Sequence, residues 1–211
     1  MNEFDAKARG WDADPAKVDR ARKVADLLAA RVPILARARV LEVGAGTGLL
    51  GFALRDRAAH VTLADGSTEM LAVAREKLRA QGPCNVDVLA LDLEGGRLPD
   101  ARFDVVCALL VLHHVTDTEA LLRRLHDVLE PGGYLCLSDL DAEDGAFHGH
   151  GKVPHQGFDR GRLAEVLRRT GFTEVRFEDA FQIEKPVHGG EVRSFPAFLA
   201  VARRPAAAPS R

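Results

Sequence analysis

The stretch from Val40 to Leu50, VLEVGAGTGLL, constrains the fold of this chain more than any other feature of its sequence. Its apolar start predicts a buried strand, the glycines at 44, 46 and 48 predict a tight turn, and the residues after the turn predict a helix. A glycine turn lets backbone N–H groups and a helix N-terminus approach a ligand closely, because no Cβ stands in the way. Glu42 narrows the choice of ligand, since a buried carboxylate repels phosphate and attracts a cationic amine or sulfonium.

Strands and helices alternate along the rest of the chain. Strands are predicted over residues 38–43, 60–65, 85–92, 103–112, 134–140, 173–184 and 194–204. Helices are predicted over residues 15–31, 47–57, 67–81, 117–130 and 159–170, and Pro131-Gly132-Gly133 is expected to end the fourth of these. This alternation predicts an α/β fold with a doubly wound, mostly parallel sheet and a closing antiparallel hairpin. We expect a single domain over residues 15–204, an irregular arm over 1–14 and a flexible tail over 205–211.

Composition excludes several classes of function. Lys and Arg total 29 against 31 Asp and Glu, and no basic block occurs, so we expect neither nucleic acid nor an anionic membrane as a partner. The three cysteines, Cys84, Cys107 and Cys136, are far apart and odd in number, which argues against a disulfide framework or a zinc site. No apolar run has the length of a membrane span or the pattern of a signal peptide. We therefore expect a cytoplasmic protein that acts on a small molecule; its oligomeric state is left open.

The chain carries four motifs in order: E-x-G-A-G-T-G from Glu42, an acid at Asp65 that ends a strand, Asp92-Leu93 after the third strand, and L-x-L-H-H-V from Leu110. As a set they resemble the motifs of the class I S-adenosylmethionine-dependent methyltransferases, most closely the small bacterial branch that acts on small molecules. The resemblance covers residues 4–204. It implies a Rossmann-like seven-stranded sheet of order 3-2-1-4-5-7-6 with strand seven antiparallel, and S-adenosylmethionine as the cofactor.

The resemblance also implies which residues bind the cofactor. The positions are Trp11, Glu42, Gly44, Ala45, Gly46, Asp65, Gly66, Met70, Asp92, Leu93 and Leu109. Glu42 is expected near the methionine amino group, and Asp65 is expected to accept hydrogen bonds from the ribose hydroxyls. Met70, Asp92 and Leu93 are expected around the adenine, and Leu109 beneath the methionine tail. Trp11, with Phe4, is expected in a lid over the cofactor. Each residue also has a plainer interpretation, such as a helix cap for Asp65, core packing for Met70, or an anchor for the first helix in the case of the two aromatics.

Two other functions are compatible with parts of the pattern. Gly46, Gly48 and Gly51 also match G-x-G-x-x-G, with Asp65 about 20 residues downstream as in NAD(P)-dependent oxidoreductases. The register disfavours that interpretation, because the strand ends near Val43 and Gly51 then falls inside the helix. A non-catalytic sensor of S-adenosylmethionine or its demethylated product is the second alternative.

Histidines gather where the acceptor is expected. His113 and His114 follow the fourth strand, and His148 and His155 lie in the long irregular segment 141–158. A general base or acceptor-orienting role for one of them is one interpretation, and local packing with solvated loop histidines is another. A metal site built from His148, His150 and nearby acids is a third. From the sequence we assign no metal ligands and leave the methylated atom open.

Overall fold

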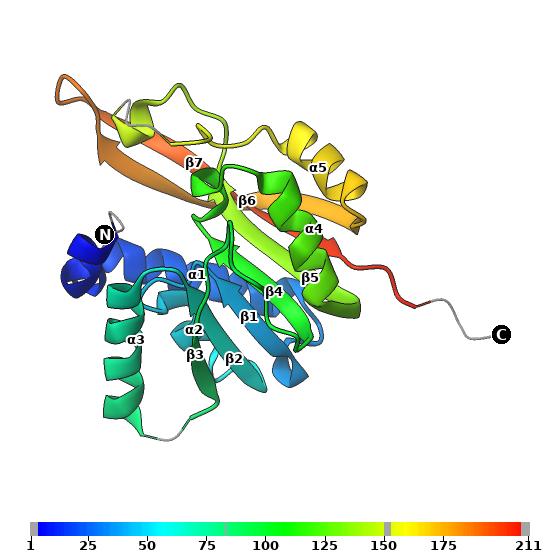
Figure 1. Cartoon of the computed structure of the whole chain (residues 1–211). Coiled ribbons are helices and arrows are strands. Elements are labelled where there is room, and N and C mark those ends of the chain that lie inside the picture. Colours follow the sequence, from blue (N-terminus) through cyan, green and yellow to red (C-terminus); the bar gives the residue numbers. More distant parts are fainter. Residues whose placement is uncertain (1–3, 83, 150–152, 208–211) are drawn as a thin grey trace.

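A computed structural model of the chain describes residues 4–82, 84–149 and 153–207 (Figure 1). Its strands are β1 (Arg39–Val43), β2 (His60–Asp65), β3 (Val86–Ala90), β4 (Phe103–Leu109), β5 (Leu129–Leu140), β6 (Thr173–Pro186) and β7 (Val192–Arg203). Its α-helices are α1 (Pro15–Arg31), α2 (Leu49–Leu54), α3 (Thr68–Gln81), α4 (Thr118–Val128) and α5 (Arg160–Arg169). Short 3-10 helices are η1 (Asp5–Ala13), η2 (Leu35–Arg37), η3 (Leu112–His114) and η4 (Ala146–His148).

The strands form one sheet in the order β3-β2-β1-β4-β5-β7-β6, as the resemblance implied. The pairs from β3 to β5 are parallel, whereas β7 runs antiparallel to both β5 and β6. The carboxyl ends of the parallel strands therefore meet at one edge of the sheet. In sheets of this kind that edge carries the ligand site.

Helices cover both faces of the sheet. The buried side chains of α1 and α2 belong to one apolar cluster, and those of α4 and α5 belong to another on the opposite face (Figure 1). Central strands contribute alternate residues to the two clusters: Val40 and Val105 to the first, Leu41 and Val106 to the second. This alternation is the geometry of a strand buried on both faces, and it makes the sheet a rigid platform for the residues at its edge.

The helix boundaries follow from capping residues that the sequence shows. Asp14 accepts a hydrogen bond from the Ala16 N–H at 2.9 Å, with Pro15 at the first helical position of α1. Ser67 caps α3 by accepting from the Met70 N–H at 3.2 Å. α2 is shorter than the helix predicted over residues 47–57.

The fifth strand starts earlier than predicted. Pro131-Gly132-Gly133 lies inside β5 rather than between a helix and a strand. The backbones are close together there: a Cβ on Gly133 would lie 3.0 Å from the Asp104 carbonyl oxygen of β4, and the register between β4 and β5 shifts at this point. Glycine therefore allows a close approach of two strands, an effect that local sequence pattern does not reveal.

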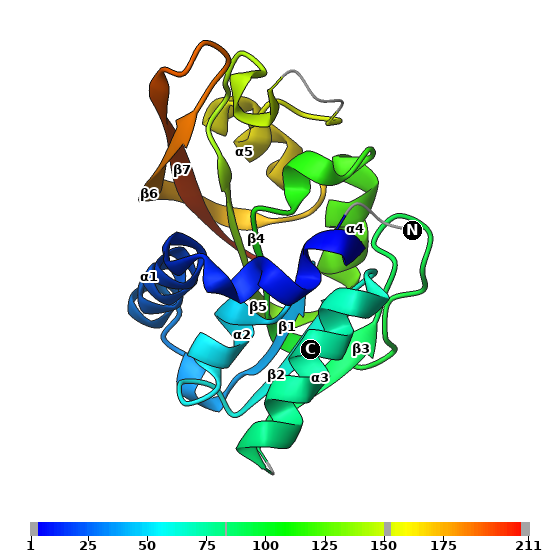
Figure 2. The ribbon, with the colours of Figure 1, turned by 90° about the vertical axis from the view of Figure 1, so that its left-hand side faces the viewer.

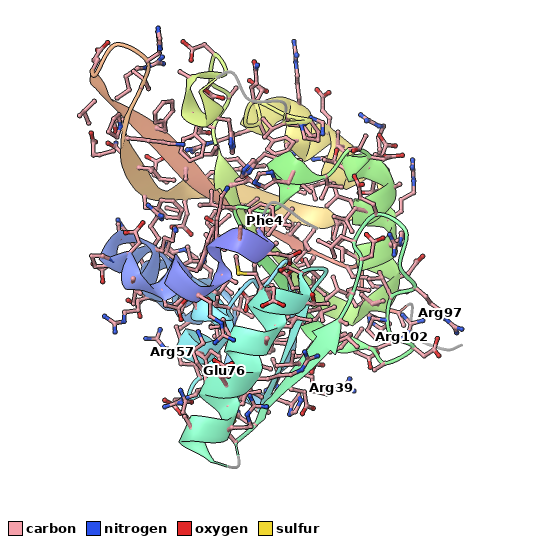
Figure 3. All side chains as sticks on the ribbon, turned by 60° about the vertical axis from the view of Figure 1, so that its left-hand side comes forward. Phe4, Arg39, Arg57, Glu76, Arg97 and Arg102 are labelled. Carbon is pink, nitrogen blue, oxygen red and sulfur yellow. The ribbon has the colours of Figure 1, made fainter. Side chains whose placement is uncertain are left out.

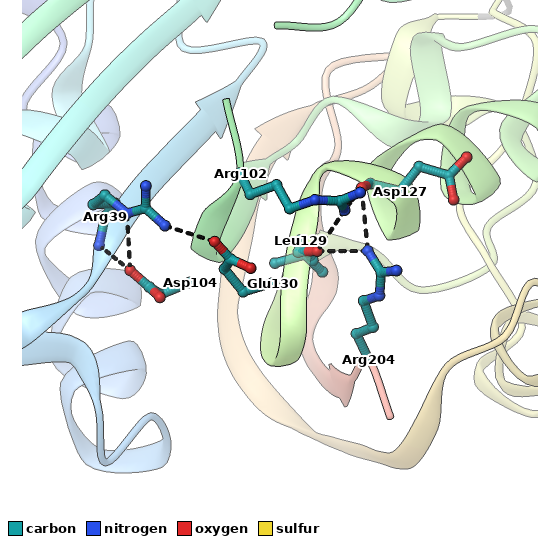
Figure 4. Close-up of polar contacts among 7 residues, drawn as sticks. All are labelled: Arg39, Arg102, Asp104, Asp127, Leu129, Glu130 and Arg204. Atoms are coloured by element: carbon teal, nitrogen blue, oxygen red, sulfur yellow. Dashed lines mark hydrogen bonds and ion pairs between the residues drawn. The ribbon is translucent and has the colours of Figure 1, made fainter. Parts of the chain in front are cut away.

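Arginine side chains form hydrogen bonds at the amino ends of the parallel strands, the end opposite to the predicted ligand edge (Figure 4). Arg39 at the start of β1 donates to Glu130 at 2.9 Å, and its backbone N–H donates to Asp104 at 2.8 Å. Arg204 donates to the carbonyl oxygens of Leu129 at 2.6 Å and Asp127 at 3.1 Å, and Arg102 donates to the same two oxygens. These bonds satisfy carbonyls that the end of α4 leaves without a helical partner.

The N-terminal arm differs from the sequence-based expectation. Residues 5–13 form η1 rather than an irregular segment, and Ala8 within it is buried. Figure 2 shows this segment in dark blue, crossing in front of the central strands between α1 and α4. Among the described residues, no helix combines the length and apolarity needed to cross a lipid bilayer.

Candidate active site

The glycine turn after β1 encloses a buried carboxyl group. Glu42 is 3 % exposed, and its Oε2 accepts a hydrogen bond from the Gly51 N–H in α2 at 2.8 Å. Burial, opposed by this bond, raises the pKa of Glu42 to about 8. A Cβ on Gly51 would lie 2.7 Å from that oxygen and 2.1 Å from Leu63 Cδ2. Gly51 is therefore required for the approach of α2 to β1 and β2, and its N–H serves Glu42 rather than a pyrophosphate.

The turn itself needs left-handed backbone at three positions. Gly44, Gly46 and Gly48 have φ values of 65°, 55° and 83°, which are unfavourable for residues with a Cβ. Ala45 between them is buried and its N–H donates to the Ala64 carbonyl at 3.0 Å, which ties the turn to β2. A Cβ on Gly46 would meet only Met70 Sδ, at 3.8 Å, so this side of the turn is sterically open. The predicted cofactor-binding turn thus forms, with Met70 beside it.

Asp65 ends β2 and holds this turn in place. Its Oδ2 accepts from the Gly46 N–H and its Oδ1 from the Ser67 N–H, both at 2.7 Å. Two of the roughly four acceptor positions of the carboxylate are thereby used, and about two are left for a ligand. Gly66 lies between Asp65 and Ser67. A Cβ on Gly66 would be 3.5 Å from the Leu91 carbonyl oxygen, so the backbone after β2 runs close to the backbone after β3.

The ends of β3 and β4 complete the edge. The Leu91 N–H donates to the Asp65 carbonyl at 2.9 Å, which brings Asp92 beside Asp65; Asp92 is exposed and its Oδ1 accepts from the Glu94 N–H. Leu93 packs against the apolar cluster beneath α4, and Leu109, half-buried, ends β4. The predicted strand over 103–112 stops there because Leu110 has a φ of 56°.

A positive φ at a leucine is unusual and turns the chain sharply. After Leu110 the chain passes over the glycine turn, where a Cβ on Gly44 would lie 2.5 Å from Val111 Cγ2. The short helix η3 follows and carries His113 and His114. The backbone outlier therefore positions both histidines at the edge where the cofactor-binding residues are predicted.

The arm is tied to the same edge by side chains. Asp12 accepts from Thr47 Oγ1 at 2.5 Å and from Lys77 Nζ at 2.8 Å, and Asp5 accepts from Ser67 Oγ at 2.6 Å. Thr47 is fully buried beneath this contact. A pocket of about 480 Å³ lies between the arm and the start of α3, lined by Asp5, Ala6, Thr68 and Glu69.

The two aromatic residues of the arm have different surroundings. Trp11 lies under Lys17 Nζ, which is 3.8 Å from its ring centroid, and so packs near the start of α1. Phe4, labelled in Figure 3, packs against His114 in a T-shaped arrangement with ring centroids 5.2 Å apart. The arm thus links the first helix to the histidines.

Three of the four predicted catalytic histidines converge. Ring centroids are 4.0 Å apart for His113 and His114, 5.1 Å for His113 and His148, and 5.4 Å for His114 and His148. His113 Nδ1 lies 2.6 Å from Asp139 Oδ1 at the end of β5, and both side chains are almost fully buried. Burial, and then the two neighbouring imidazoles, lower the pKa of His114 to about 4, so its ring is neutral at pH 7.

His155 lies outside this cluster. Its Nε2 is 3.1 Å from the Val115 carbonyl, to which it donates, and its backbone N–H donates to the His113 carbonyl at 3.2 Å. These bonds anchor the segment 141–158 to η3, which is a structural role. His150, included in the metal interpretation of the sequence, lies outside the described residues.

Comparison with known proteins finds similarity to methyltransferases over part of the chain. Residues 40–133, from β1 into β5, match the family model described as a methyltransferase domain. The chain is 38 % identical over 152 residues to a ubiquinone biosynthesis O-methyltransferase of Xanthomonas campestris pv. campestris. Over this region, from β1 into β5, the chain is similar to methyltransferase domains.

The match to individual methyltransferases is partial. The alignment to the Xanthomonas protein covers 70 % of this chain and 63 % of that one, so the chain spans less than two thirds of the relative's length. A malonyl-[acyl-carrier protein] O-methyltransferase of Enterobacter lignolyticus is 34 % identical over 122 residues, covering 58 % of this chain and 47 % of that protein. A solved phosphoethanolamine N-methyltransferase 2 of Haemonchus contortus, in complex with S-adenosyl-L-methionine, has the same fold. Its TM-score is 0.72 at 15 % identity, covering 97 % of this chain and 60 % of that one.

The sequence did not reveal three side chains that connect the parts of the site. Thr47 and Ser67 donate hydrogen bonds to Asp12 and Asp5 of the arm, and Asp139 orients His113. Ser67 precedes a predicted helix, so its role as a helix cap accounts for it. Its hydrogen bond to Asp5 joins residues far apart in the chain and has no local sequence signal. Asp139 did carry a signal, because an acid at the carboxyl end of an apolar strand faces the ligand edge in this fold.

Proposed function

We propose that this protein transfers a methyl group from S-adenosylmethionine to a small-molecule acceptor. The observation that carries the proposal is a pair of carboxyl groups beside the glycine turn: Glu42 lies one residue before the end of β1, and Asp65 ends the adjacent parallel strand β2 and bonds to Gly46. A cationic amine and a pair of ribose hydroxyls match these two acids, whereas a pyrophosphate does not. The match of residues 40–133 to a methyltransferase domain supports the same cofactor.

The open side of the turn at Gly46, where a Cβ would meet only Met70 Sδ, supports binding of the cofactor there. Asp65 is already oriented by the Gly46 and Ser67 N–H groups and has acceptor positions left for hydroxyls. Glu42 is buried within the turn, where it would neutralise the methionine ammonium. Met70, Asp92 and Leu93 would surround the adenine, and the arm would cover it. When bound, S-adenosylmethionine supplies an activated methyl group on a sulfonium, which is the chemistry that these residues lack.

The acceptor is proposed to enter beside the histidine cluster, His113, His114 and His148. Oxygen is the first acceptor atom to test, because both curated relatives described above are named O-methyltransferases. A hydroxyl acceptor must lose its proton, and Nε2 of His113 can accept one because Asp139 supports the ring at Nδ1; the lowered pKa of His114 makes that ring a poor base. Phe4, which contacts His114, would help to exclude water from this side.

The experiment is a transfer assay with S-adenosylmethionine and a panel of phenols, carboxylic acids, thiols and amines, measuring S-adenosylhomocysteine formed. We expect turnover with at least one oxygen acceptor.

Asp65→Asn should weaken cofactor binding roughly 10-fold or more, since it removes a charged hydrogen-bond acceptor. Asp87→Asn on β3, whose side chain is 74 % exposed, is the matched control and should behave as the unaltered protein. Tight cofactor binding without transfer to any acceptor would favour the sensor, and binding of NAD(P)H instead would favour the oxidoreductase.

A further inference from the structure

Three imidazole rings from separate parts of the chain meet beside the predicted acceptor position. His113 and His114 come from η3 after β4, and His148 comes from η4 in the segment after β5. One ring nitrogen from each lies within 4.8 Å of those from the other two. Among the described residues this is the group of histidine, cysteine and acidic side chains whose donor atoms converge closely enough to hold one ion.

The first of the three imidazoles is oriented as a ligand would be. Asp139 Oδ1 can only accept, so the 2.6 Å contact places a proton on His113 Nδ1 and leaves the lone pair on Nε2. Asp139 is itself held by the N–H groups of Leu140 at 2.8 Å and His113 at 3.3 Å. A carboxylate behind an imidazole is the usual support for a metal-binding histidine, because it sets the tautomer and increases ligand basicity.

We propose that His113, His114 and His148 bind one divalent transition-metal ion of the zinc class, with Asp139 as the positioning residue behind His113. Three imidazole nitrogens suit zinc, cobalt or nickel, whereas magnesium and calcium require oxygen ligands. Three histidines also leave a fourth position of a tetrahedral ion open, as in catalytic zinc sites. This inference departs from the sequence analysis, which assigned no metal ligands and considered His150 with His148.

A modest movement of one short element would complete the site. Nitrogen ligands at about 2.0–2.1 Å from a tetrahedral ion lie roughly 3.3 Å apart, so the donors must approach by up to about 1.5 Å. The helix η4 lies between Gly145 and Gly149, with φ values of 91° and 61°, and a Cβ on Gly149 would meet nothing within 4 Å. Glycine at both ends gives η4 the freedom to bring His148 inwards.

The ion would also change how the acceptor is prepared, a consequence that rests on the proposed function. An acceptor hydroxyl in the open fourth position would lose its proton to water more readily, because the cation would stabilise the resulting anion. The imidazoles would then act as ligands, and no histidine would be needed as the base. Ion binding itself requires no methyl transfer and is measured separately.

The test is Co²⁺ binding by the untagged chain, residues 1–211, monitored by the visible absorption of the bound ion and by displacement with Zn²⁺. We expect one Co²⁺ per chain. His148→Ala should weaken binding at least about 100-fold, and Asp139→Asn should weaken it about 10- to 100-fold, as expected for loss of a supporting carboxylate. His60→Ala is the matched control. His60 also pairs with an acid, Asp87, but its side chain is partly exposed and it does not belong to the three-histidine group. Excess Mg²⁺ should not displace Co²⁺.

Several results would overturn the inference. They are no Co²⁺ binding by the unaltered chain, binding that survives both His148→Ala and His148→Gln, or binding lost equally in His60→Ala. Thermal unfolding of each variant separates loss of the site from loss of the fold. Methyl transfer by protein that binds no Co²⁺ would overturn this inference alone, whereas ion binding without transfer to any acceptor would overturn the proposed function alone.

Discussion

At the scale of single residues, Glu42 is the group whose chemistry depends most on its surroundings. Its pKa is raised from 4.5 to about 8, mainly by burial, so the folded protein without ligand carries this carboxyl protonated at neutral pH. A bound ammonium group would favour the ionised form. Cofactor binding and proton release at Glu42 are therefore expected to be linked.

This linkage predicts a pH dependence with a definite sign. Because the folded state binds the proton more tightly than the unfolded state, the contribution of Glu42 to stability is full below pH 4.5 and is lost as the pH rises through about 8. The free energy of unfolding of the unaltered protein should therefore fall relative to that of Glu42→Gln across this window, by a few kcal/mol at most. Chemical denaturation at several pH values measures this difference. A constant difference from pH 5 to pH 8 would contradict the account.

Cofactor affinity should show the opposite trend. Binding of S-adenosylmethionine should strengthen from pH 6 to pH 8 in the unaltered protein and release a proton in calorimetry. In Glu42→Gln the affinity should be lower and nearly independent of pH. Equal affinities at pH 8 would show that Glu42 does not neutralise the cofactor amine.

Gly51 provides a second test at this scale. Gly51→Ala introduces a Cβ that must displace Leu63 and Glu42, so it should destabilise the fold by about 1–3 kcal/mol, as overpacking does. Gly10→Ala is the matched control, because nothing lies within 4 Å of a Cβ there. Thermal unfolding of the pair measures the effect, and equal stability would refute the close approach of α2 to the sheet.

At the scale of elements, the arm and the segment 141–158 are the parts that define the site above a rigid sheet edge. The sequence indicated most regular elements, since helical spacing, caps and glycines determine α1, α3 and β2 locally. It did not indicate η1, because this short segment of mixed polar and small residues has no clear apolar period and depends on contacts of Asp5 and Asp12 with residues far along the chain. The sequence likewise did not predict that the rings of His148 and His113 lie side by side, because this depends on tertiary packing rather than on residue spacing.

The arm is predicted to contribute to cofactor binding. Asp12→Ala removes the contacts to Thr47 and Lys77, and should weaken S-adenosylmethionine binding several-fold; deletion of residues 1–13 should weaken it roughly 10-fold or more, about 1.4 kcal/mol. Arg9→Ala is the control, because its ion pair with Glu76 is largely exposed and such pairs contribute little. Calorimetric titration gives the affinities. Unchanged affinity after the deletion would mean that Trp11 and Phe4 only anchor the fold.

At the scale of the whole molecule, the arginine contacts of Arg39, Arg102 and Arg204 and the predicted ligand edge lie at opposite ends of the sheet. Sheet order followed from the family resemblance, whereas strand alternation alone predicted only a doubly wound sheet. The position of Pro131-Gly132-Gly133 within β5 could not be predicted, because it depends on the contact with β4. The arginines in Figure 4 stabilise the far end without contacting the site.

This separation predicts that stability can be lowered without loss of binding. Arg204→Ala leaves carbonyl oxygens of His126, Asp127 and Leu129 without this donor and should cost about 1–2 kcal/mol of unfolding free energy. Its affinity for S-adenosylmethionine below the unfolding temperature should not change. Arg97→Ala, at a fully solvated pair with Asp100, should alter neither quantity. A parallel loss of affinity in Arg204→Ala would show that the two ends are coupled.

The central claim, that the edge of the sheet at β1 and β2 binds a methyl donor, is tested most directly by a crystal structure with S-adenosylhomocysteine. We predict that its ribose hydroxyls lie within hydrogen-bond distance of Asp65, its amino group lies beside Glu42 and the glycine turn, and its sulfur faces His113 and His114. Binding elsewhere, or with the ribose away from Asp65, would contradict the account.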